Sequence, residues 1–557
     1  MSEIVSEPVT ESTDNAPAEK VEQSVHAEVP VSETTQPVAE APAATSGEVP
    51  TETPSEVTAE VTAEVFTEVP TEVPAEVPVE VSSPATEVPV QEKIIVDKPS
   101  MPSFLSKFKF QATMAFESAM HTALMRNSSK GWDLQTHLMV SAVRYYMNRS
   151  GRTIEELQEA TQRASLATAK GVCNQPCTIA EPDEATAACL AGMINAARDK
   201  LGADAGFADA SIPDATITCV AGEWVAKESS VTAGEPVSVG PDENVILFAH
   251  GGSYTFCSSA DHRYLTSELA ANTGAKVLSI DYRLAPQHPV PSAIADFLTA
   301  YHYLLHTCKI PCSRIFFAGD SAGGGIFLAV LSILLCNKNA DMPVPMGAIA
   351  FAPFVDMTRC LPTERSRAMD KYDYIPNANH YPQYKKSAVW PVENKRYFPY
   401  AEDNAIAHPL VSPMTNPCWT GSCPLLLFVG EERFRDAVLL FSKLYQDAGN
   451  PTWTYYHETM PHVFQFIGAH HASVEKSYET VKCFVETVCK PGEDKLESKR
   501  VDVTVRGEEL QLWEKLIPAL SYEEIKDKMV QRTTELKYLL RYVVADLYPA
   551  DKKKAKK

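Results

Sequence analysis

The stretch Ile315-Phe316-Phe317-Ala318-Gly319-Asp320-Ser321-Ala322-Gly323 decides the fold. Four apolar residues lead into a G-x-S-x-G sequence, and an apolar helical run starts near Gly325. A serine flanked by small residues at a tight strand-to-helix turn has its hydroxyl lifted out of the sheet. The same turn aims the N-terminus of the following helix at any negative charge that develops there. The pattern predicts a nucleophile elbow with Ser321 at its tip.

Apolar runs on either side of this stretch predict a series of buried strands. They lie at Val245 to Ala249, Lys276 to Ile280, Arg314 to Ala318, Gly347 to Phe351, Leu425 to Val429 and Thr452 to Tyr456. Continuous apolar runs separated by helical stretches are typical of parallel strands that are buried on both faces. We therefore expect an α/β fold with a mostly parallel central sheet flanked by helices.

A second motif, His250-Gly251-Gly252-Ser253, directly follows the first of these strands. Acyl transfer creates an oxyanion, and backbone N–H groups can stabilise it where glycines allow close approach. Together with the elbow, the motif predicts an oxyanion hole made by the N–H groups of Gly251, Gly252 and Ala322. Alone, the motif is equally compatible with an ordinary glycine turn at the end of a strand.

A serine nucleophile needs a base, because its free hydroxyl reacts poorly. With this elbow the expected chain order is serine, then acid, then histidine. His462, just after the last predicted strand, is therefore the candidate base. Three carboxylates follow the preceding strand, and Glu432 is the first choice for the acid, ahead of Asp436 and Glu431.

The N-terminal residues 1–98 form an acidic, low-complexity segment of repeated Glu-Val pairs interrupted by proline. Repeated proline prevents a regular helix, and the segment has no apolar clusters that could form a core, so we predict a disordered tail. The first 100 residues hold 21 Asp and Glu against 3 Lys, and so carry most of the chain's net charge of -22. The acidity therefore says little about the substrate, and no extended basic patch suggests nucleic acid.

Composition divides the rest of the chain into three parts. Residues 99–240 are predicted to form a helical N-terminal cap and a linking segment, with apolar stretches from Phe104 and from Trp132. These stretches would cover a catalytic domain or bind a membrane surface. Residues 241–490 form the predicted catalytic domain. Within it, the aromatic-rich segment 354–407 would either line an acyl or alcohol pocket or form a satellite core.

Residues 491–557 are predicted to form a helical extension, helical over Tyr522 to Tyr548. It ends in the basic run Lys552 to Lys557, for which a solvated tail and a contact with anionic lipid are the two interpretations.

The lack of a recognisable secretion signal predicts a cytoplasmic protein. The N-terminus has no basic, then apolar, signal-peptide pattern, and no apolar run reaches the roughly 18 residues of a membrane span. The 13 cysteines are then expected to be reduced thiols, and their spacing does not suggest zinc. We expect no metal and no organic cofactor. Peripheral contact with a membrane or lipid droplet stays open, and the oligomeric state is not predicted.

Over residues 244–485 the chain resembles the hormone-sensitive-lipase-like branch of the α/β-hydrolases. The two motifs above carry this resemblance together with Asp281-Tyr282-Arg283-Leu284-Ala285-Pro286 and the His288-Pro289 pair that follows it. The Pro-His-Val-Phe setting of His462 is similar to that of fungal-type members, which include steroid and sterol-ester deacetylases.

The resemblance implies a serine hydrolase that cleaves small-molecule carboxylic esters through an acyl-enzyme. A short-to-medium acyl chain is implied, on a sterol or another lipid-like alcohol. The chain departs from the family at Ser253, where a third glycine is frequent, and at Glu432, where the usual acid is aspartate. Two alternatives remain: an amidase or deacetylase with the same triad, and a non-catalytic ligand-binding protein on the same fold.

Overall fold

The computed structural model describes residues 131–132, 134–148, 152–162, 168–232, 234–240, 242–378, 384–391, 396–466, 471–490, 496–511 and 514–547. The predictions for the acidic tail, for the stretch from Phe104 and for the terminal basic run lie outside these residues.

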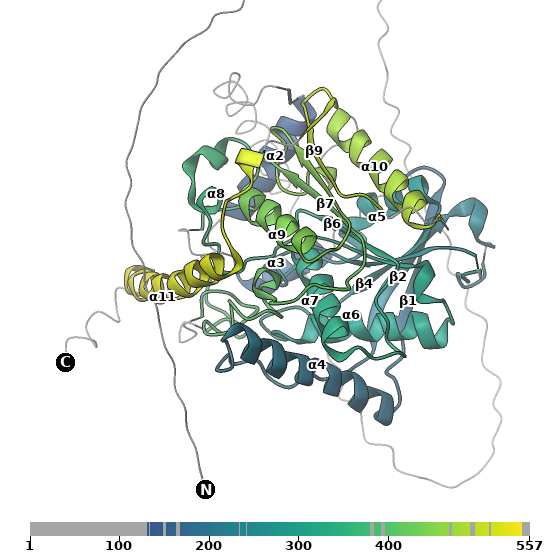
Figure 1. The fold of residues 1–557 in the computed structure, drawn as a ribbon, viewed down its shortest axis with the longest axis horizontal. Helices are drawn as coiled ribbons and strands as arrows, with labels where there is room; N and C mark the ends of the chain where they lie inside the picture. Colours follow the sequence, from purple (N-terminus) through teal and green to yellow (C-terminus); the bar gives the residue numbers. More distant parts are fainter. Residues whose placement is uncertain are drawn as a thin grey trace, which may run out of the picture. The chain divides into compact units, whose positions relative to one another are not determined.

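The described strands form one sheet in the order β1-β2-β4-β3-β5-β6-β7-β8-β9-β10 (Figure 1). Their bounds are β1 (Val172–Ile179), β2 (Val220–Lys227), β3 (Val245–Ala249), β4 (Lys276–Asp281), β5 (Ile315–Asp320), β6 (Gly347–Phe351), β7 (Leu425–Gly430), β8 (Thr452–His457), β9 (Lys499–Val503) and β10 (Glu509–Gln511). Neighbours from β4 through β9 pair in parallel. Antiparallel pairs occur where β2 meets β1 and β4, and between β9 and β10. The mostly parallel sheet that the sequence predicts is confirmed.

The six predicted strands are β3 to β8, and every residue of β3, β5, β6, β7 and β8 is buried. The outer strands escaped prediction because they are partly exposed to solvent and show no continuous apolar run. In β1 only the two end residues are buried, and in β10 every residue is exposed. The predicted linking segment thus contributes two strands, β1 and β2. The extension 491–557, which we expected to be helical, contributes β9 and β10 before its helix begins.

Helices cover both faces of the sheet (Figure 1). One face packs α5 against α10, and the other packs α4, α6 and α7 together. The bounds are α2 (Leu134–Asn148), α3 (Ile154–Gln162), α4 (Glu184–Ala205), α5 (Arg263–Thr273), α6 (Ser292–His302), α7 (Ala322–Asn337), α8 (Pro362–Arg365), α9 (Arg435–Asp447), α10 (Ala472–Val488) and α11 (Tyr522–Leu547). Since α7 is buried along most of its length, the turn that precedes it sits at the centre of the domain.

The C-terminal helix α11 covers the stretch over which the sequence predicts a helix. Ile525 and Met529 are buried, and the hydroxyl of Tyr522 donates a hydrogen bond to the carbonyl of Thr415 at 2.8 Å. None of the helices within the described ranges is both long enough and apolar enough to cross a membrane.

Candidate active site

Ser321 occupies the turn between β5 and α7, as the motif predicts. Its φ of 49° and ψ of -116° are strained for a residue that carries a Cβ. The end of β6 holds this turn in place: the N–H of Ser321 donates to the carbonyl of Phe351 at 2.9 Å, and its carbonyl accepts from the N–H of Phe354 at 2.8 Å. Strain of this kind persists only where the surroundings fix it, and it is commonest at functional sites, which keeps Ser321 the candidate nucleophile.

The glycines of the elbow allow it to pack directly on the end of β3. A Cβ added to Gly323 would lie 1.9 Å from the carbonyl oxygen of Ala249, and one added to Gly319 would lie 2.6 Å from the carbonyl carbon of Gly323. No side chain fits either position. The G-x-S-x-G pattern is thus explained by backbone contacts around the serine.

The structure brings Glu432 and His462 together on the loops that follow β7 and β8. Nδ1 of His462 donates a hydrogen bond to Oε2 of Glu432, and both side chains are buried. The other carboxylate oxygen, Oε1, accepts the N–H of Gly430 at 3.0 Å. The other two candidate acids instead form ion pairs with Arg435: Glu431 at 2.6 Å and Asp436 at 3.1 Å. Of the three carboxylates, Glu432 is therefore the one that orients the imidazole.

Nearby carboxylates raise the pKa of His462. Burial by itself would lower the pKa of His462, but the negative charges of Glu432, Asp373 and Asp320 outweigh it and raise the pKa above its usual value. Nε2 is buried and has no hydrogen-bond partner among the described residues. The rings of Phe434 and Tyr374 pack edge-on against the imidazole at centroid distances of 4.9 and 5.9 Å. The arrangement leaves Nε2 available to take a proton.

Close backbone contact joins the acid loop to the histidine loop. A Cβ added to Gly430, the last residue of β7, would lie 2.2 Å from the carbonyl oxygen of Met460. Only glycine lets the two loops approach this closely, so the separation of Glu432 and His462 depends on this position.

The oxyanion loop corrects one prediction. The N–H of Gly251 donates to Oδ1 of Asp320 at 2.9 Å, so it is not free to bind an oxyanion. The N–H groups of Gly252 and Ser253 make no hydrogen bond within the described residues. Ala322 is the first residue of α7, where N–H groups lack a partner in their own helix. Gly252 and Ala322 remain candidate donors, and Ser253 joins them in place of Gly251.

A buried charge cluster holds this loop, and the sequence analysis missed it. His262 lies between Asp261, 2.6 Å from its Nδ1, and Asp320, 3.4 Å from its Nε2. Burial lowers the pKa of His262, but the two carboxylates outweigh it and raise the pKa well above the usual value. His262 thus lies next to the carboxylate that anchors Gly251, and the raised pKa favours the charged imidazolium that pairs with it. The one sign of this cluster in the sequence is Asp320, the acidic residue directly before Ser321.

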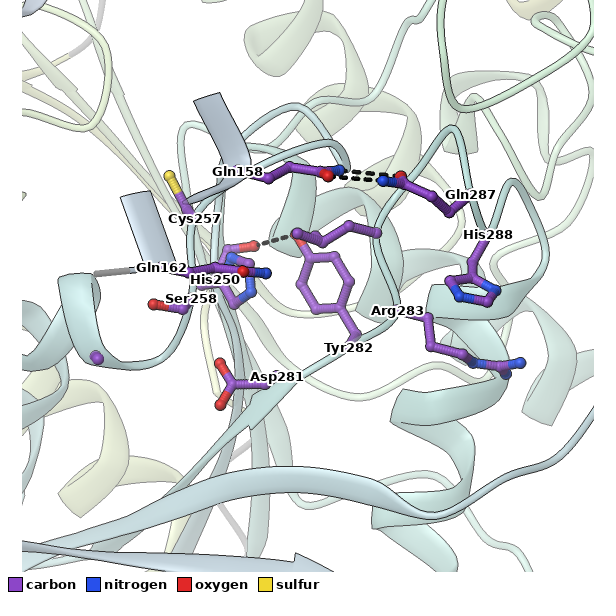
Figure 2. A pocket seen from close by; sticks show the side chains of 12 residues that line it. Gln158, Gln162, His250, Cys257, Ser258, Asp281, Tyr282, Arg283, Gln287 and His288 are labelled. Atoms are coloured by element: carbon purple, nitrogen blue, oxygen red, sulfur yellow. Dashed lines mark hydrogen bonds between the residues drawn. The ribbon is translucent and has the colours of Figure 1, made fainter. Parts of the chain in front are cut away.

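A pocket of about 500 Å³ lies beside the oxyanion loop (Figure 2). On one side, the side chain of Gln158 in α3 exchanges hydrogen bonds with that of Gln287 at 2.7 and 3.1 Å. At the base, His250 stacks on Tyr282 with ring centroids 4.3 Å apart. The Asp281 to Leu284 part of the third motif lines this cavity, and Ser321 does not. Within this motif, the hydroxyl of Tyr282 donates a hydrogen bond to the carbonyl of His250 at 2.8 Å and so supports the oxyanion loop.

The chain is similar in sequence to known proteins. Residues 246–466 match a family described as having the alpha/beta hydrolase fold. An acetyl-hydrolase of Streptomyces hygroscopicus is 31% identical over 234 residues, which cover 40% of this chain and 71% of that protein. Lipase 2 of a Moraxella species is 27% identical over 255 residues, or 40% of this chain and 55% of that protein. A solved esterase from the bacterial hormone-sensitive lipase family is 22% identical, covers 64% of this chain and 99% of that one, and has a TM-score of 0.46. The chain belongs to the α/β-hydrolases.

Proposed function

We propose that the protein hydrolyses carboxylic esters with Ser321 as the nucleophile, His462 as the base and Glu432 as the acid. The observation that carries the proposal is the buried hydrogen bond between Nδ1 of His462 and Glu432, which leaves Nε2 without a partner among the described residues. Ser321 follows β5, and the pair follows β7 and β8, so all three lie at the carboxyl ends of parallel strands in one sheet. Ligands of open α/β sheets bind at that edge. The names of the relatives, acetyl-hydrolase and lipase, support the same reaction.

In the first half-reaction, Oγ of Ser321 attacks the ester carbonyl carbon while Nε2 of His462 takes the hydroxyl proton. Glu432 stabilises the imidazolium that results. The oxyanion accepts hydrogen bonds from the N–H groups of Gly252 and Ala322, and the N-terminus of α7 adds a favourable dipole. When the tetrahedral intermediate collapses, the carbon–oxygen bond to the alcohol breaks, and His462 returns the proton to the leaving alcohol.

In the second half-reaction, water replaces the alcohol. His462 takes a proton from the water as its oxygen attacks the acyl carbon, and the proton passes to Oγ of Ser321 as the acyl–serine bond breaks. The carboxylic acid leaves and the free enzyme returns. We assign the substrate a short-to-medium acyl chain, which the name of the acetyl-hydrolase relative supports at the short end.

Hydrolysis of a p-nitrophenyl ester series from acetate to palmitate tests the proposal. The wild-type protein should show a rate maximum at acetate to octanoate, and Ser321→Ala should lose that activity. p-Nitroacetanilide, the amide that matches p-nitrophenyl acetate, should react far more slowly. Wild-type protein that is folded but inactive on every ester, or a Ser321→Ala variant that stays active, would contradict the proposal. Faster cleavage of the anilide would favour an amidase.

A further inference from the structure

One carboxylate of the long segment between β6 and β7 contacts both catalytic loops. Asp373 is 2% exposed. Its Oδ2 accepts the N–H of Arg433, the residue after the candidate acid, at 2.8 Å. Its Oδ1 accepts the N–H of Ile375 at 3.2 Å and, at 3.4 Å, the N–H of His462 itself. A single side chain thus joins the backbone of the acid loop to the backbone of the histidine loop.

The segment that carries Asp373 is fastened to the acid loop by further bonds. The guanidinium of Arg433 is buried; its Nε donates to the carbonyl of Ile375 at 2.6 Å and its Nη1 to that of Ser366 at 2.9 Å. In return, the hydroxyl of Thr363 donates to the carbonyl of Arg433 at 2.9 Å. The position of Asp373 is therefore fixed from several directions, and little freedom remains for it to follow a moving loop.

We propose that Asp373 is a positioning residue, which holds the histidine loop against the acid loop and places a negative charge beside the imidazole of His462. The inference rests on the proposed function, because it assigns His462 the role of base. It also gives part of the aromatic-rich segment a third role, in addition to the pocket and the satellite core that its composition suggested.

The charges around the pair set the direction of the effect. The carboxylates of Glu432, Asp373 and Asp320 face His462 and raise its pKa against the opposing effect of burial. The cations near Asp373 are Arg433 and Arg144 of α2, whose Nη2 donates to the carbonyl of Asp373 at 2.9 Å. Removing the charge of Asp373 should therefore lower the pKa of His462 and move the acid limb of the rate profile to lower pH.

Two substitutions separate charge from position. Asp373→Asn removes the charge, and its amide can accept N–H groups through one atom only, whereas both oxygens of Asp373 accept them in the structure. Asp373→Glu keeps the charge but moves the carboxylate by about one methylene. Asp296→Asn is the matched control, because Asp296 is also buried and also accepts a backbone N–H, that of Arg283 at 2.7 Å, but belongs to α6.

The experiment uses the full-length protein and measures, from pH 5 to 9, the rate at which a fluorophosphonate probe labels the serine. Ester kinetics and thermal unfolding accompany it. For Asp373→Asn we expect the acid limb to move by roughly half a pH unit or more to lower pH. For Asp373→Glu we expect the acid limb of the rate profile to stay at the wild-type pH. The rate should be about tenfold lower, and in the ester kinetics kcat should change more than KM. Asp296→Asn should keep the wild-type limb.

An acid limb of Asp373→Asn that coincides with wild type would overturn the inference, and so would an Asp373→Glu variant with the wild-type rate. If Asp373→Asn does not fold, the Asp373→Glu rate decides alone. Labelling of Ser321→Ala at the wild-type rate would instead sink the proposed function, so the two failures are distinguishable.

Discussion

Nδ1 of His462 and Oε2 of Glu432 share a hydrogen bond between two buried side chains. A buried glutamate in this position both fixes the tautomer of the imidazole and stabilises its charged form. The longer side chain of glutamate is accommodated because its second oxygen is held by the N–H of Gly430 at 3.0 Å. Both carboxylate oxygens of Glu432 are therefore held in place.

Replacing Glu432 by glutamine should lower kcat for a p-nitrophenyl ester by about 10³- to 10⁴-fold, because the imidazole loses its counter-charge and an amide does not enforce the tautomer with the proton on Nδ1. Glu431→Gln is the matched control, since Glu431 pairs with Arg435 and Tyr456 instead. Equal losses in the two variants would argue against Glu432 as the acid.

The pH dependence of kcat/KM follows from the environment of His462. The base acts in its neutral form, and the surrounding carboxylates raise its pKa. Activity should therefore fall with decreasing pH through a midpoint above 6.5, the ordinary value for histidine. A rate profile over pH 5 to 9 gives this midpoint, and a midpoint below 6.5 would contradict the charge arrangement.

Gly430→Ala tests the contact between the acid and histidine loops. The added Cβ would lie 2.2 Å from the carbonyl oxygen of Met460, so a loop must shift, at an expected cost of about 1–3 kcal/mol and with a loss of kcat. Gly192→Ala is the control, because a Cβ there meets nothing within 4 Å and Gly192 lies inside α4. Unfolding temperatures should fall for the first variant and rise slightly for the second.

His457, at the end of β8, should make the protein sensitive to acid. Burial lowers its pKa to about 3, and neither ring nitrogen has a hydrogen-bond partner among the described residues. Below about pH 6.5 this histidine takes up a proton in the unfolded chain but not in the folded one. It therefore lowers the free energy of unfolding, by an amount that is absent above that pH and grows as the pH falls toward 3. The slope for this group is at most about 1.4 kcal/mol per pH unit.

The variant His457→Phe isolates this effect, since the ring already packs against Phe464 at a centroid distance of 4.5 Å. Its unfolding temperature should fall less than that of wild type between pH 7 and pH 5. Parallel falls in the two proteins would show that His457 is not the group responsible.

The sequence predicted the centre of the fold better than its edges. The strands β3 to β8 are continuous apolar runs because both faces are buried, and such runs are visible in sequence. The strands β1 and β10 are largely solvated, so their composition resembles that of loops. Helices that precede the first strand could be predicted only where apolar residues recur, and the stretch from Phe104 lies outside the described residues.

Within the candidate site, the residues that follow predicted strands could be found because chain order and strand ends place them. Ser321, Glu432 and His462 are of this kind. Asp373 and His262 are not: Asp373 contacts loops 60 and 89 positions further along the chain, and no local pattern distinguishes it from a surface aspartate. Gly251 was assigned wrongly as an oxyanion donor. A glycine in the sequence indicates that its N–H can approach a ligand, but the sequence does not show that this N–H already donates to the carboxylate of Asp320.

Peptide mapping after fluorophosphonate labelling tests most directly whether Ser321 is the nucleophile. The full-length protein is labelled at pH 8, digested, and examined by mass spectrometry next to Ser321→Ala. We expect one modified peptide, the one that contains Ser321, together with loss of ester hydrolysis in the labelled protein and in the variant. A modification at another residue, or ester hydrolysis that continues in Ser321→Ala, would contradict the assignment.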